Sequence, residues 1–131
     1  MPFALALTVI LILLALFQLA LIFGAPIGRF AWGGQHRVLP IRLRVGSGVS
    51  IVIYALIALI AWDRVGVAHI FPDLFSVIAM WVVFAYFVLG IFMNAISRSK
   101  SERWTMVPVC LVLAALSLLI SLGYGAMAAA A

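Results

Sequence analysis

The stretch ALALTVILILLALFQLALIF, which covers residues 4–23, decides the fold of this chain. Its polar residues are Thr8 and Gln18, and it carries no charge. A helix that crosses the roughly 30 Å hydrocarbon core of a bilayer needs about 20 mostly apolar residues. This stretch therefore predicts a membrane-spanning helix.

Three further apolar stretches, residues 48–65, 74–96 and 105–125, meet the same criterion. Of the 131 residues, 69% are hydrophobic and 8% are charged. Soluble domains average about half apolar and about a quarter charged residues. We therefore predict an all-α membrane protein, with residues 1–131 forming a single membrane domain folded as a four-transmembrane-helix bundle.

The basic residues predict the orientation of the bundle. The first loop carries four of them and the third loop carries three, whereas the opposite side has Arg64; the seven are Arg29, Arg37, Arg42, Arg44, Arg98, Lys100 and Arg103. Cytoplasmic loops carry an excess of Lys and Arg. We expect both termini outside and both basic loops in the cytoplasm, in a bacterial inner (cytoplasmic) membrane.

Four polar residues of the spans are expected at a similar depth. Counting about 1.5 Å per residue from the helix ends places Gln18, Tyr54, Tyr86 and Asn94 in the cytoplasmic half of the bilayer. Such a layer is either a pocket or path for a neutral or lipid-like molecule, or a set of hydrogen-bonded contacts between helices. We prefer the second interpretation, because polar groups in lipid must find partners within the protein.

The longest stretch that is not apolar is GAPIGRFAWGGQHRVLPIRLRVGS, residues 24–47. In residues 41–45 apolar and cationic residues alternate, so an extended segment would direct Arg42 and Arg44 to one side. Gly46-Ser47-Gly48 would then start a helix, whose free N–H groups attract anions. We expect an ordered interfacial loop that binds anionic headgroups or phosphate through Arg29, Arg37, Arg42, Arg44 and Ser47. The alternative is that the arginines only mark the cytoplasmic side.

Residues with catalytic or metal-binding chemistry are few. The first loop holds no Asp, Glu or Cys, and no Ser before its end, which leaves His36 as its one plausible general base. On the opposite side, Asp63, His69 and Asp73 could together hold Zn²⁺. We prefer a solvated loop in which Asp63 pairs with Arg64. We predict no catalytic residue, no metal site, no cofactor and no nucleic-acid partner.

The charged stretch SRSKSERW, residues 97–104, predicts how the fourth helix begins. Ser99 and Glu102 have the spacing of a capping box, in which the serine side chain accepts a hydrogen bond from the glutamate N–H. We therefore expect Ser99 to cap the helix and Glu102 to lie in its first turn.

Two motifs carry a resemblance to a group of known proteins. GAPIGRFAWGGQHRVLP, followed by LRVGS, and the later SRSKSERW resemble the GAPxG…WGG…LP…GS first loop and the SRSxxER third loop of small four-span bacterial integral membrane proteins. The resemblance covers most of the chain. It implies the four-span architecture and brings no known activity, cofactor or substrate with it.

Three functions are compatible with these patterns. We prefer a non-enzymatic membrane protein that is an accessory or lipid-interacting component of the inner membrane, with anionic lipid headgroups as partners. The alternatives are a small oligomeric transporter or permeation path that uses the polar layer, and a membrane enzyme acting on a lipid-like substrate. A face of small residues from Cys110 to Gly125 would suit a homo-oligomer or a partner membrane subunit.

Overall fold

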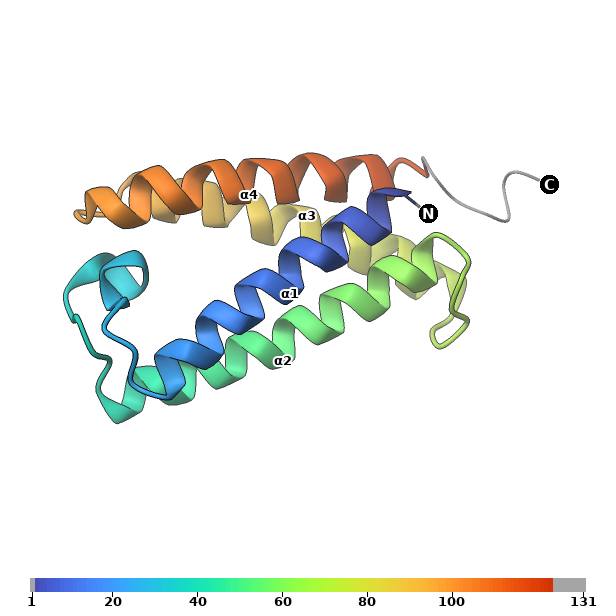
Figure 1. The fold of residues 1–131 in the computed structure, drawn as a ribbon. Coiled ribbons are helices and arrows are strands. Elements are labelled where there is room, and N and C mark those ends of the chain that lie inside the picture. Colours follow the sequence, from blue (N-terminus) through green and yellow to red (C-terminus); the bar gives the residue numbers. More distant parts are fainter. Residues whose placement is uncertain (1, 124–131) are drawn as a thin grey trace.

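Figure 1 shows the computed structural model, which describes residues 2–123 apart from the side chain of Arg29. Its long helices are α1 (Pro2–Ile22), α2 (Ile41–Arg64), α3 (Asp73–Ala95) and α4 (Lys100–Ser121). Two short 3-10 helices, η1 (Gly28–Phe30) and η2 (Trp32–Gly34), lie between α1 and α2. Each α-helix is long and apolar enough to cross a membrane. The predicted all-α bundle of four long apolar helices is confirmed for the described residues.

The helices form two antiparallel hairpins, α1–α2 and α3–α4 (Figure 1). The two helices of each hairpin pack more extensively against each other than either packs against any one helix of the other hairpin. The hairpins converge at the end that carries the N-terminus and the α2–α3 loop, and they diverge toward the other end. The α1–α2 and α3–α4 loops and the first turns of α2 and α4, which together hold most of the cations, therefore lie at the diverging end of the molecule.

The main core fills the end at which the hairpins converge. Its buried side chains come from all four helices and include Leu7, Leu11, Ile57, Ile60, Met80, Val83, Phe87, Leu113 and Ile120. A smaller cluster of Leu21, Ala31 and Leu39 fixes the first loop against the end of α1. Large apolar side chains cover the outward faces, as lipid-facing surfaces require; Leu16, Val52 and Phe92 are examples.

Two polar contacts join helices at the converging end. The Trp62 indole Nε1 donates to Thr8 Oγ1 at 2.8 Å, which ties α2 to α1. The Arg64 guanidinium Nη2 donates to the carbonyl oxygen of Ser121 at 3.2 Å, which ties α2 to the end of α4. The second contact joins the two hairpins and also provides a partner for a carbonyl at a helix end, where the helix itself offers none.

The first turn of α2 corrects two predictions. Residues 41–45 are helical rather than extended, and Gly46-Ser47-Gly48 lie inside the helix rather than at its start. Pro40 precedes the first turn, and its carbonyl oxygen accepts hydrogen bonds from two N–H groups of that turn. Leu and Arg are good helix formers, and an alternation over five residues is too short to outweigh this propensity.

The remaining helix ends differ less from the expected spans. α1 and α3 lie within a few residues of the stretches 4–23 and 74–96. α4 begins at Lys100, earlier than residue 105, and residues 124 and 125 of the expected fourth span lie outside the described residues. Ser99 caps α4 as predicted, since its side chain accepts from the Glu102 N–H at 3.3 Å.

Candidate functional site

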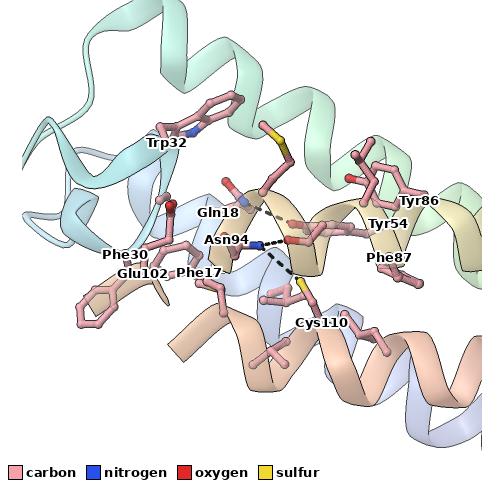
Figure 2. Close-up of a pocket in the computed structure, with 18 residues that line it drawn as sticks. Phe17, Gln18, Phe30, Trp32, Tyr54, Tyr86, Phe87, Asn94, Glu102 and Cys110 are labelled. Carbon is pink, nitrogen blue, oxygen red and sulfur yellow. Dashed lines mark hydrogen bonds between the residues drawn. The ribbon is translucent and has the colours of Figure 1, made fainter. Parts of the chain in front are cut away.

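A cavity of about 320 Å³ lies between the two hairpins where they diverge, and part of the first loop lines it (Figure 2). We call it the inner cavity. The four polar residues expected in one layer, Gln18, Tyr54, Tyr86 and Asn94, all line it. Most of the remaining wall is apolar and aromatic, and includes Leu14, Phe17, Phe30, Trp32, Phe87, Met93 and Met106. The volume lies in the usual range for small-molecule sites, about 300–1,000 Å³.

Gln18 and Tyr54 join α1 to α2 on one wall of the inner cavity. The Gln18 amide Nε2 donates to the Tyr54 hydroxyl at 3.2 Å (Figure 2). The Gln18 side chain is only 9% exposed, and its Oε1 has no hydrogen-bond partner among the described residues. An unpaired buried polar atom costs about 1–3 kcal/mol. The wall therefore favours an occupant that offers a hydrogen-bond donor.

Asn94 and Tyr86 belong to α3, on the facing wall. The Asn94 amide Nδ2 donates to the Gly90 carbonyl oxygen at 2.8 Å and to Cys110 Sγ at 3.5 Å (Figure 2). A Cβ on Gly90 would lie 3.4 Å from Cys110 Sγ, so the glycine lets α3 approach α4 closely. The amide nitrogens of both Gln18 and Asn94 thus donate within the protein.

Trp32 reaches the cavity from the first loop in an unusual backbone conformation. Its φ of 53° lies in the left-handed region, which residues other than glycine rarely adopt. Gly33 and Gly34, which follow, have φ of 78° and 71°. The indole Nε1 donates to Ser47 Oγ at 3.3 Å, and a Cβ on Gly46 would lie 2.8 Å from two atoms of the ring. The ring therefore rests directly on the α2 backbone.

Glu102 is a candidate that sequence reasoning assigned to helix capping alone. Its side chain is 6% exposed and lines the inner cavity. The carboxylate Oε2 accepts from the Gly33 N–H at 3.2 Å, so it connects α4 to the first loop. One signal could have found it, because Glu102 is the single acidic residue in a stretch, 97–104, that carries three cations.

A second cavity of about 420 Å³, which we call the outer chamber, adjoins the inner cavity at the first-loop end. The two spaces share four lining residues, Trp32, Met93, Asn94 and Glu102. The rest of the outer wall includes the polar residues Gln35, His36, Arg42 and Ser97. The combined space is apolar between the helices and charged toward the basic loops. His36, the one plausible general base of the first loop, lies in this chamber.

The residues predicted to contact anionic headgroups lie in different places. Arg42 is exposed and lines the outer chamber, while Arg37 is exposed on the first loop. Ser47 is fully buried inside α2, where it accepts the hydrogen bond from Trp32. The side chain of Arg29 lies outside the described part of the structure. Of the four whose side chains are described, Arg42 is the one that lines the outer chamber.

Arg44 has a structural contact instead. Its Nε donates to the carbonyl oxygen of Leu39 at 2.8 Å. Its guanidinium also lies against Gly24, where a Cβ would be 3.3 Å from Nη2. Gly24 has a φ of 89°, which a side chain would disfavour. Arg44 therefore closes the first loop by contacting both of its ends.

At the opposite end of the molecule, the expected surface pairing of Asp63 with Arg64 is wrong. Asp63 is 7% exposed, and its carboxylate accepts from the N–H groups of Ile70 and Phe71, at 2.6 and 2.8 Å, and from the Ser76 hydroxyl. Arg64 donates to α4. Within residues 2–123, no group of three His, Cys, Asp or Glu residues could hold a metal ion. Asp63 therefore holds the second loop, between α2 and α3, through these hydrogen bonds.

Comparison of the chain with family models, with curated proteins and with solved structures found no match. The resemblance of the first-loop and third-loop motifs to small four-span bacterial membrane proteins therefore stays a prediction. The chain is a small protein with four helices suited to crossing a membrane, and the inner cavity with its outer chamber is its candidate functional site.

Proposed function

We propose that this chain is a non-enzymatic integral membrane protein that binds a membrane lipid or a similar amphiphile between its two hairpins. The observation that carries the proposal is the joined space, in which a largely apolar, aromatic inner cavity adjoins an outer chamber whose wall includes Gln35, His36 and Arg42. An amphiphile has the same division, with an apolar tail and a polar head. An amphiphile would therefore place its tail between the helices and its head beside the basic loops.

The floor of the inner cavity favours binding over a continuous permeation path. Phe87 and Leu113 line the cavity and also belong to the buried main core. The cavity therefore ends where the hairpins converge, and a close-packed core lies beyond it. A second copy or a partner subunit on the lipid-facing surface is compatible with the proposal.

The distribution of cations supports a cytoplasmic position for the outer chamber. Seven of the eight Lys and Arg residues lie in the α1–α2 and α3–α4 loops or in the first turns of α2 and α4, at the diverging end, and Arg64 is at the other end. By the positive-inside rule the diverging end faces the cytoplasm of a bacterial inner membrane, with both termini outside. Arg37 and Arg42 then lie near lipid phosphates, where each cation contributes about 1 kcal/mol to attraction toward an anionic leaflet.

Filling the boundary between the two spaces tests the proposal. Asn94 lines both of them, so Asn94→Phe would place a phenyl ring where an amphiphile has to pass. We expect native mass spectrometry of the protein in mild detergent to show loss of most of the lipid retained by the wild type. Val88→Phe is the matched control, because Val88 is on the same helix and 45% exposed. It should retain lipid as the wild type does.

The two variants should give the helical circular dichroism of the wild type, which separates a filled cavity from misfolding. If Asn94→Phe keeps its helices and still retains as much lipid as Val88→Phe, the retained lipid is bound elsewhere. That result would contradict a binding site between the hairpins.

A further inference from the structure

Glu102 places a carboxylate on the wall that the inner cavity shares with the outer chamber. It comes from the first turn of α4, where the helix dipole interacts favourably with a negative charge. Resting on the proposed function, we infer that the bound amphiphile carries a protonated primary amine, and that Glu102 is its counter-ion.

The carboxylate of Glu102 has hydrogen-bonding capacity to spare. Among the described residues, it accepts one hydrogen bond, from the Gly33 N–H to Oε2. An ionised carboxylate offers about four acceptor positions. A primary ammonium has three N–H donors, and hydrogen bonds between ionised partners are stronger than those between neutral groups. The remaining positions of this buried carboxylate therefore suit an ammonium group better than a neutral hydroxyl.

A second, independent observation also favours an occupant that carries a hydrogen-bond donor. Gln18 lines the inner cavity with a side chain more than nine-tenths buried, and its Oε1 has no partner among the described residues. Since the amide nitrogens of Gln18 and Asn94 already donate within the protein, the amide oxygens of these two residues are left to accept from an occupant. Two acceptors from different helices, α1 and α4, thus line the same space (Figure 2).

The aromatic lining suits a cation as well. The inner cavity is bounded by six aromatic side chains, Phe17, Phe30, Trp32, Tyr54, Tyr86 and Phe87 (Figure 2). Aromatic faces attract an ammonium within about 6 Å, with a larger effect where water is excluded. The same rings pack against an apolar tail. A carboxylate within an aromatic wall therefore selects an amine joined to an apolar body over a fatty acid or an anionic lipid.

Two kinds of amphiphile carry a primary ammonium on an apolar body, and a contact with Arg42 would distinguish them. One is the headgroup of an aminophospholipid, whose phosphate would reach Arg42 in the outer chamber while its ammonium reaches Glu102. The other is a single-chain amine without a phosphate. Arg42 and Glu102 line the outer chamber from different helices, α2 and α4, which fits the opposite charges of a phosphate and an ammonium.

The test measures selectivity among matched amphiphiles. The full chain in mild neutral detergent is incubated with equimolar phosphatidylethanolamine, phosphatidylcholine and phosphatidylglycerol of identical acyl chains, and separately with dodecylamine and dodecanol. Native mass spectrometry then gives the retained ratios. We expect the wild type to prefer the primary amine in at least one set by about tenfold, the contribution of a charge-assisted hydrogen bond. Phosphatidylcholine is the key competitor, because its quaternary nitrogen cannot donate.

Glu102→Gln should abolish the preference and keep the fold, because the amide oxygen can still accept from Gly33. Asp73→Asn, which changes an exposed carboxylate at the opposite end, should leave the preference intact. Arg42→Gln should lower retention of phosphatidylethanolamine if an aminophospholipid is the source, and should not lower retention of dodecylamine. Whether or not Arg42→Gln lowers the retention of phosphatidylethanolamine, the ammonium inference stands. The result identifies which of the two amphiphiles supplies the ammonium.

Retention of all amphiphiles without an amine preference in the wild type would overturn the inference and leave the proposed function standing. A preference that survives Glu102→Gln would do the same. Retention of none of the five would remove the proposed function and the inference together. If Glu102→Gln does not fold, the wild-type ratios of phosphatidylethanolamine to phosphatidylcholine and of dodecylamine to dodecanol still decide.

Discussion

At position 46, the lack of a side chain lets the ring of Trp32 rest on the backbone of α2. Gly46→Ala would place a Cβ 2.8 Å from two ring atoms, which forces the ring away and breaks its hydrogen bond to Ser47. We expect the free energy of unfolding to fall by about 1–3 kcal/mol, as for other overpacked sites. Denaturant unfolding in detergent, followed by circular dichroism, measures it.

Gly48→Ala is the matched control, two positions farther along the same helix. A Cβ there meets only Ile22 Cδ1, at 3.9 Å, which is an ordinary contact. Because alanine is favoured over glycine inside a helix by about 0.5–1 kcal/mol, this variant should be as stable as the wild type or more stable. Equal stabilities for the two variants would show that the Trp32 ring does not pack there.

At the scale of elements, Asp63 connects the end of α2 to the start of α3 by accepting three hydrogen bonds. Asp63→Asn would set an amide NH₂ against these donors, so at least one donor loses its partner. We expect a loss of about 1–3 kcal/mol in unfolding free energy, the cost of unpaired buried polar groups. Faster hydrogen exchange at the amides of Ile70 and Phe71 should accompany it.

Asp73→Asn provides the comparison, because Asp73 is exposed in the first turn of α3. Removing its charge should cost less than about 1 kcal/mol, the usual size of a helix-dipole contribution. Unchanged exchange at Ile70 and Phe71 in Asp63→Asn would mean that the carboxylate does not hold the second loop.

The elements that the sequence predicts best are those governed by composition. Four apolar stretches predict four helices because lipid leaves few alternatives for the backbone. The first turn of α2 was predicted wrongly, because residues 41–45 show an alternation that local helix propensity outweighs. The burial of Asp63 was also missed, since its partners come from a loop whose fold is not encoded in a simple period.

At the scale of the whole molecule, the sequence predicts the depth of the polar residues in the membrane better than it predicts how the helices pack. A constant rise per residue places Gln18, Tyr54, Tyr86 and Asn94 at similar heights, and the structure has them around one cavity. That the hairpins diverge there could not be read from periodicity, because it depends on how whole helices pack. Glu102 was assigned to capping alone for the same reason, since its contact with Gly33 spans 69 positions in the chain.

The single cysteine of the chain tests this arrangement. Cys110 lines the inner cavity, which adjoins the outer chamber at the first-loop end and stops at the main core. A membrane-impermeant cationic methanethiosulfonate reagent should therefore label Cys110 from the side of the basic loops, and dodecanol should slow the reaction by occupying the cavity.

Ser117→Cys, made in a Cys110→Ser background, is the control, because Ser117 is fully buried about two turns farther along α4. It should react far more slowly from either side. Labelling of Cys110 mainly from the converging end, or equal rates at the two positions, would show that the hairpins do not open as the structure has them.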